Sequence, residues 1–140
     1  MKAWWGGRDL TGSLLKQFFY HFQNTIFVIE GRDELCGFVM GYFSQTRSQE
    51  AYIHFVAVNP MVRKKGIGRF LYEKFFALCK ENGRTIIRCC TAPTNIESIE
   101  FHTQMGFQIE PGNAEMNGFP VTLDYLGKDD HKVLFVKELI

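Results

Sequence analysis

Residues 51–82 have the sequence AYIHFVAVNPMVRKKGIGRFLYEKFFALCKEN, in which an apolar run, a basic glycine-containing loop and an amphipathic stretch follow one another directly. The apolar run 51–58 predicts a buried strand, and the Asn-Pro pair after it predicts the end of that strand, because proline cannot donate to a β-ladder. Over 68–82 the apolar residues recur at helical spacing, and an Asn-Gly pair predicts the helix end. The segment therefore predicts a strand, a basic loop and a helix in that order, and the rest of the fold is predicted around it.

The sequence on both sides of this segment predicts further helices and strands by the same periodicities. The expected elements are a helix over 10–22, strands over 26–30 and 35–44, a strand over 84–90, a helix ending at Gly106 with a Thr94 and Glu97 capping box, and strands over 107–110 and 132–138. The connection 111–131 is long for a compact domain, so we expect a hairpin of its own or a mobile flap. These elements predict one mixed α/β domain over residues 1–140.

Composition narrows the classes of function. The 140 residues have a net charge of +1, with 46% hydrophobic and 15% aromatic residues. The apolar content argues against disorder, and the balanced charge argues against nucleic acid and membrane partners. Short apolar runs and an N-terminus without a basic-then-apolar leader predict a cytoplasmic protein. We expect no metal site, because the cysteines lack CxxC spacing and fit the core: Cys36, Cys79, Cys89 and Cys90.

The basic loop between the buried strand and the next helix predicts an anion site. Helix N-termini present backbone N–H groups without intrahelical acceptors at the positive end of the macrodipole, and these attract phosphate. Glycines allow close backbone approach, and cationic side chains add charge-assisted bonds. Walker and dinucleotide patterns do not fit, and a solvated basic turn stays the alternative from these residues alone. The loop comprises Arg63, Lys64, Lys65, Gly66, Ile67, Gly68 and Arg69.

Two patterns in the chain resemble motifs A and B of the GNAT superfamily of acyl-CoA-dependent N-acyltransferases. The motif A pattern is Arg63, Gly66 and Gly68 after the strand, and the motif B pattern is Asn95, Ser98, His102, Gly106 and Phe107. The resemblance is close over residues 35–107 and follows element order elsewhere. It implies a single-domain, mixed, largely antiparallel sheet with a splayed central strand pair and flanking helices.

The resemblance also implies acetyl-CoA as co-substrate and no metal. Backbone groups of Val56 and Val58 would pair with the pantetheine arm, amides of the 64–69 loop would hold the pyrophosphate, and Asn95 would hydrogen-bond the pantetheine region. The implied cofactor-binding residues are Val56, Ala57, Val58, Arg63, Lys64, Lys65, Gly66, Ile67, Gly68, Arg69, Asn95, Ser98 and His102.

The chain departs from the family's pattern in three places. Only Met1 to Trp5 precede a glycine pair, so the family's first strand is short or missing. Histidine stands at position 102, where the family commonly has tyrosine, and the 111–131 loop is longer than usual. In the family the N-terminal region lies beside the acceptor pocket, so Trp5 and Arg8 are candidate substrate contacts, with Tyr125 or Asp124 from the long loop.

Acyl transfer to an amine needs a base, an acid and a donor to the oxyanion. Strict strand alternation places Glu50, Tyr52, His54, Val56 and Val58 on one side. His54 and Glu50 are therefore the candidate bases, with a solvent relay as the alternative. By the resemblance His102 faces the thioester sulfur as general acid, or it only packs on the pantetheine. A backbone N–H near Val56 would bind the oxyanion.

The main hypothesis is N-acetyl transfer from acetyl-CoA to a primary amine of a small molecule or protein by direct attack, with a peptide amine as the protein-type partner. The alternative is a non-catalytic acyl-CoA-binding or regulatory module, which would bind the cofactor and release no thiol. A nucleic-acid-binding α/β domain would need basic and stacking residues on one sheet face, and balanced charge argues against it. An exposed edge strand leaves a homodimer open.

Overall fold

The computed structural model describes residues 16–140 except residue 64. The described residues form two compact units, 16–84 and 85–140, each with its own antiparallel strand pairs and helices. The predicted mixed α/β fold with a largely antiparallel sheet and flanking helices is confirmed. The splayed strand pair and the single domain stay predictions, and Trp5, Arg8 and Lys64 lie outside the described residues.

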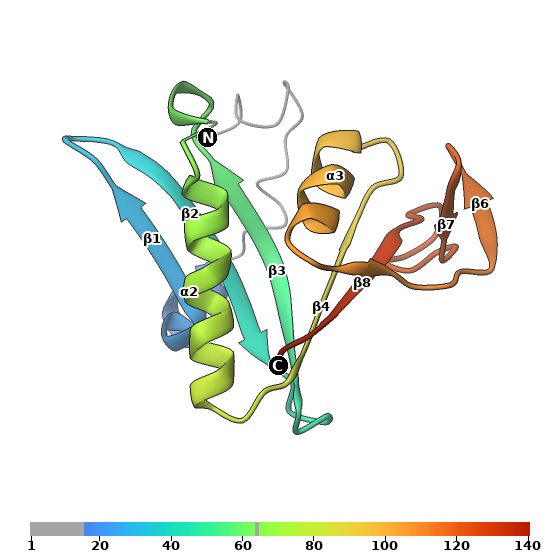
Figure 1. Ribbon diagram of the computed structural model, residues 1–140, viewed down its shortest axis with the longest axis horizontal. Helices are drawn as coiled ribbons and strands as arrows, with labels where there is room; N and C mark the ends of the chain where they lie inside the picture. Colours follow the sequence, from blue (N-terminus) through green and yellow to red (C-terminus); the bar gives the residue numbers. More distant parts are fainter. Residues whose placement is uncertain (1–15, 64) are drawn as a thin grey trace. The chain divides into compact units, whose positions relative to one another are not determined.

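The first unit is a three-stranded antiparallel meander with helices on its faces. Its elements are α1 Lys16–His21, η3 Gln23–Thr25, β1 Ile26–Glu30, β2 Leu35–Phe43, β3 Glu50–Val58, η4 Pro60–Val62 and α2 Ile67–Glu81. β2 pairs with β1 and with β3, and the long helix α2 lies across the sheet (Figure 1). Within the described residues, no helix is long and apolar enough to cross a membrane.

Two glycines of β2 let α2 lie directly on the sheet. A Cβ at Gly37 would come within 3.2 Å of the Ile67 side chain and 2.9 Å of the Ala57 carbonyl oxygen. One at Gly41 would overlap the ring of Phe75, which is fully buried. The apolar face of α2 therefore packs against main chain as well as side chains, and its position over β2 is closely fixed.

A β-bulge at His54 breaks the alternation of β3. Met40 pairs with Phe55 but its neighbour Gly41 pairs with Ile53, so His54 is the extra residue. Paired residues share a face, and the prediction that positions 50, 52, 54, 56 and 58 all lie on one side is therefore wrong. Before the bulge Tyr52 faces α1, whereas after it positions 56 and 58 face α2.

The second unit is built on β8, which pairs with β4 on one side and β5 on the other. Its elements are β4 Ile86–Thr91, α3 Ile96–Gln104, β5 Gln108–Ile109, β6 Ala114–Met116, β7 Phe119–Val121 and β8 Val133–Glu138. The hairpin expected within 111–131 is confirmed as β6 and β7. Asn117 and Gly118 form its turn at φ 54° and 82°, as a type I′ turn requires.

Two of the four cysteines predicted as core residues are fully buried. Burial raises the pKa of the Cys79 thiol to about 12 despite the nearby charge of Arg84, and the pKa of the Cys89 thiol is also raised by burial. Both thiols therefore stay protonated and unreactive near neutral pH. Cys36 and Cys90 are partly exposed, and none of the four is in a disulfide.

The contact between Gly41 and Phe75 predicts a stability effect. Gly41→Ala should lower the free energy of unfolding by about 1–3 kcal/mol, because the new methyl group overlaps the Phe75 ring and lies 2.7 Å from the Tyr52 carbonyl oxygen. Urea denaturation measures the change. Adding Phe75→Leu should recover part of the loss, and an unchanged midpoint for Gly41→Ala alone would contradict the packing described here.

Candidate functional site

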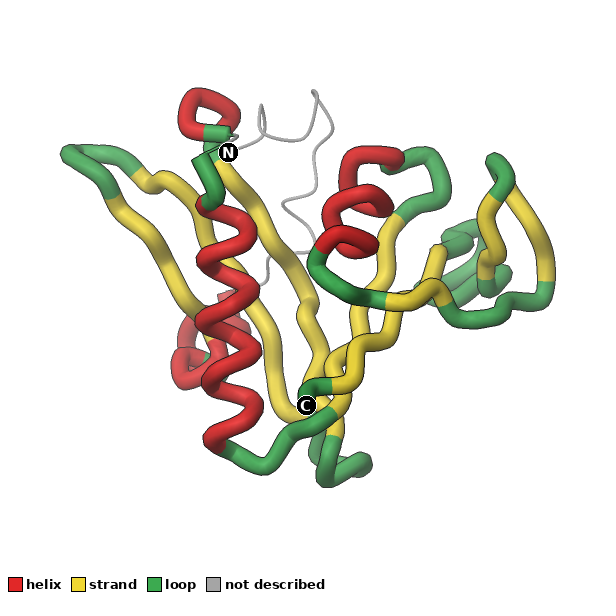
Figure 2. The backbone as a smooth tube through the Cα atoms, viewed as in Figure 1, coloured by secondary structure: helices red, strands yellow, loops and turns green. Residues whose placement is uncertain are grey.

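The basic loop over residues 63–69, called the anion loop below, lies where β3 ends and α2 begins. β3 ends at Val58, the 3₁₀ turn η4 follows, and the chain enters α2 at the same end of the first unit (Figure 2). The predicted strand, loop and helix thus lie where the sequence placed them, with α2 starting one residue before Gly68.

The start of α2 is suited to bind an anion. Gly66 precedes the helix in the left-handed conformation at φ 77°, and among the described residues no side chain caps the helix start. The first helical hydrogen bond joins the Phe70 N–H to the Gly66 carbonyl oxygen at 2.9 Å. The N–H groups of residues 67–69 therefore precede the ladder, and no acidic side chain lies in this first turn. A diphosphate would meet backbone donors and a positive helix end.

The cationic side chains around the loop have different local partners. The Arg63 Nε–H donates to the Val58 carbonyl oxygen at 3.2 Å, so this side chain turns back onto the end of β3. Arg69 lies 3.9 Å from Glu73, one helical turn further on, and both side chains are more than half exposed. Lys65 is exposed. Positive charge thus stays near the helix start, and Arg63 also joins the loop to the strand.

His54 and Glu50 occupy different surroundings on β3. The His54 ring stacks on Phe18 of α1, with centroids 4.7 Å apart and an interplanar angle of 11°. Glu50 starts the strand, and its carboxylate lies 3.6 Å from Arg47. The bulge gives His54 a main-chain geometry that regular strand residues lack, and Phe18 holds its ring, a contact that sequence periodicity did not predict.

The motif B residues Asn95, Ser98 and His102 form a local network in α3. The Asn95 Oδ1 accepts the Ser98 N–H at 3.2 Å, so Asn95 is the N-cap. The predicted capping box of Thr94 and Glu97 is therefore wrong, because the N-cap is one residue later. Asparagine and threonine are both favourable N-cap residues, so their presence at adjacent positions did not show which one caps the helix. Binding of pantetheine by Asn95 stays a prediction.

His102 is a buried part of the second unit's core. Its ring is 3% exposed and stacks on Phe135 with centroids 4.9 Å apart. The Nδ1 atom lies 2.7 Å from the Ser98 carbonyl oxygen, which can only accept, so the neutral ring carries its proton on Nδ1. Burial lowers the pKa of His102 despite this bond. The imidazolium that a general acid would need is therefore disfavoured, and the acid role stays a prediction.

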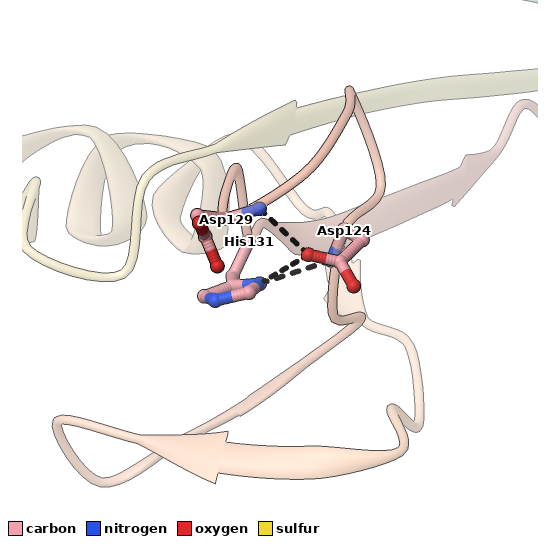
Figure 3. Close-up of side chains that lie close together, drawn as sticks. All are labelled: Asp124, Asp129 and His131. Atoms are coloured by element: carbon pink, nitrogen blue, oxygen red, sulfur yellow. Dashed lines mark hydrogen bonds and ion pairs between the residues drawn. The ribbon is translucent and has the colours of Figure 1, made fainter.

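The loop before β8 holds the candidate substrate contacts Asp124 and Tyr125. Tyr125 is 41% exposed. Figure 3 shows its neighbours Asp124, Asp129 and His131, whose ligand atoms lie within 4.8 Å of one another. The His131 Nδ1 accepts the Asp124 N–H at 2.9 Å, and the Asp124 Oδ1 accepts the Asp129 N–H at 2.7 Å. These bonds brace the loop before β8.

The burial of His102 predicts how stability depends on pH. Its folded pKa is lowered, so below about pH 6.5 the unfolded chain takes up a proton that the folded chain resists. This contribution to stability is complete above that pH and is lost as pH falls, by at most about 1.4 kcal/mol per pH unit. His102→Phe keeps an aromatic ring and should flatten the dependence in urea unfolding at pH 5.5 and 7.5. Parallel curves for both proteins would contradict this.

Comparison with known proteins places the chain in a family. The family model described as Acetyltransferase (GNAT) family matches residues 4–107. An uncharacterized N-acetyltransferase of Methanocaldococcus jannaschii is 32% identical over 90 residues, which cover 61% of this chain and 40% of that protein. The chain thus spans about two fifths of the length of this curated relative.

Solved structures share the fold at low sequence identity. Ard1 from Thermoplasma volcanium has a TM-score of 0.74 at 22% identity, covering 91% of this chain and 79% of that one. The yncA structure from Salmonella typhimurium, with its cofactor acetyl-CoA, has a TM-score of 0.66 at 18% identity, covering 97% and 78%. Because the family model covers most of its length, the chain belongs to the GNAT family of acetyltransferases.

Proposed function

We propose that this protein transfers the acetyl group of acetyl-CoA to a primary amine. The observation that carries the proposal is the junction of β3 and α2, where Gly66 precedes a helix that no side chain of the described part of the chain caps, beside Arg63, Lys65 and Arg69. Membership of the GNAT family supports the diphosphate of CoA as the ligand of this site. The acetyl-CoA bound in the Salmonella typhimurium structure supports the same cofactor.

The pantetheine arm would lie along β3, paired with backbone groups near Val56 and Val58. His54 is four residues before the strand end, about 13 Å at 3.3 Å per residue, and Glu50 is twice as far. The carboxylate of Glu50 also has Arg47 beside it. His54 is therefore the better placed of the two candidate bases for a thioester held part-way along the strand.

Direct attack accounts for every atom. The neutral amine forms an N–C bond to the thioester carbonyl carbon, an oxyanion develops, and the C–S bond breaks. The amine proton goes to His54, directly or through water, and the leaving thiolate of CoA takes up one proton. A backbone N–H at the bulge, near Val56, would donate to the oxyanion.

The acceptor is an amine of a small molecule or of a peptide. Tyr125 stays a candidate contact because it is partly exposed on a braced loop. Trp5 and Arg8 stay candidates from the sequence. A homodimer and a cytoplasmic location also stay predictions.

Calorimetry with CoA tests the binding site. Lys65→Ala should weaken CoA binding about three- to tenfold, because one charge-assisted contact to phosphate is lost. Lys80→Ala is the matched control, since Lys80 lies in the last turn of α2, at the end of the helix away from the loop. Equal affinities of the wild-type protein and Lys65→Ala for CoA would contradict the proposal that this loop binds the CoA diphosphate.

Acetyl transfer to a panel of amines, followed by release of the CoA thiol, tests the chemistry. His54→Ala should lower kcat about 10²- to 10⁴-fold while the KM for acetyl-CoA stays within about twofold, because a base acts on the amine and not on cofactor binding. His21→Ala, an exposed histidine of α1, serves as the control.

Two results would count against this mechanism. Unchanged turnover of His54→Ala at every pH would favour the solvent relay. CoA binding without thiol release from any amine would favour the non-catalytic module.

A further inference from the structure

Asn59 is a buried polar residue between β3 and η4 to which the sequence pattern gave no role in cofactor binding. It is 9% exposed. Its side-chain Nδ2 donates to the Leu35 carbonyl oxygen at 3.2 Å, and its Oδ1 accepts the Met61 N–H at 3.0 Å. Its backbone N–H donates to the Cys36 carbonyl oxygen at 2.7 Å, and its carbonyl oxygen accepts the Val62 N–H at 3.0 Å. Asn59 thus joins the start of β2 to the turn that leads into the anion loop.

The other end of the loop rests on the same part of β2. Ile67, the first residue of α2, packs against Gly37, where a Cβ would lie 3.2 Å from the Ile67 side chain. Leu35, Cys36 and Gly37 are consecutive. Three residues of one strand therefore hold both ends of the connection between β3 and α2, by hydrogen bonds at one end and by close packing at the other.

We propose that Asn59 is a positioning residue for the diphosphate of CoA, an inference that rests on the proposed function. Asn59 carries no charge, and its amide group is used within the protein, so its effect passes through the main chain. Backbone donors bind phosphate only when they converge on it. By fixing the turn after β3, Asn59 sets where the first N–H groups of α2 stand relative to the strand that guides the pantetheine arm.

Two ligands separate this role from general support of the fold. CoA contains the diphosphate, whereas pantetheine has the same arm without it. Asn59→Ala removes both side-chain bonds and should weaken CoA binding about ten- to hundredfold, because the donors are misplaced. Pantetheine binding, followed by ligand-observed NMR, should stay within about twofold because the arm does not use the loop.

Asn59→Ser separates the two side-chain bonds. Serine can still accept the Met61 N–H but cannot reach the Leu35 carbonyl oxygen, so its CoA affinity should fall about three- to tenfold. This milder variant decides the question if Asn59→Ala does not fold. Asn82→Ala is the matched control: Asn82 donates to the Leu78 carbonyl oxygen at 2.8 Å at the far end of α2, and CoA affinity should not change.

The outcomes test the positioning role of Asn59 separately from the proposed acetyltransferase function. Selective loss of CoA affinity in both Asn59 variants supports the positioning role. Wild-type CoA affinity in Asn59→Ala and Asn59→Ser, or equal losses for CoA and pantetheine, overturns that role and leaves the acetyltransferase proposal standing. If the wild-type protein does not bind CoA, both proposals fail together.

Discussion

The close approach of α2 to β2 is the constraint on which the first unit depends. Glycine at positions 37 and 41 removes the side chains that would hold the helix away from the sheet. Phe75 then packs directly on the strand, and Ile67 is fixed at the first turn. Because the N–H groups that we propose to bind the diphosphate belong to that turn, packing of the apolar helix face also sets the position of the proposed site. The packing of α2 on β2 therefore contributes both to the stability of the first unit and to the position of the proposed diphosphate site.

Periodicity predicted the elements well because each has a continuous pattern. The strand over 51–58 and the helix over 68–82 match β3 and α2 to within one residue at each end. The bulge at His54 was not predictable from the sequence. An extra residue changes the pairing of β3 with β2 but does not change the residue composition of β3 in a recognisable way. A single shift of register then moved Val56 to the opposite face from Tyr52. Long-range pairing, which local patterns do not encode, decides such positions.

Motif residues were harder to interpret, because each has a structural use as well. Asn95 caps α3 and Ser98 supplies the carbonyl oxygen that fixes the proton of His102. Both contacts are local in sequence and would exist in any helix of this pattern. Asn59 is the opposite case: its partners on β2 are far away in sequence, so its pattern suggested only the end of a strand. The chemistry of Asn59 was predictable from the sequence, but its partners on β2 were not.

The balance of charge explains why geometry should dominate cofactor binding here. With a net charge of +1, the protein has no strong overall field to draw an anion from a distance. The Arg63 Nε–H donates to the end of β3, and Arg69 lies near Glu73, so these two cationic side chains also have partners within the protein. In the proposed site, the N–H groups at the start of α2 would add directional hydrogen bonds, which act only over hydrogen-bond distances. Neutral residues that aim these donors should therefore matter as much as the cations that surround them.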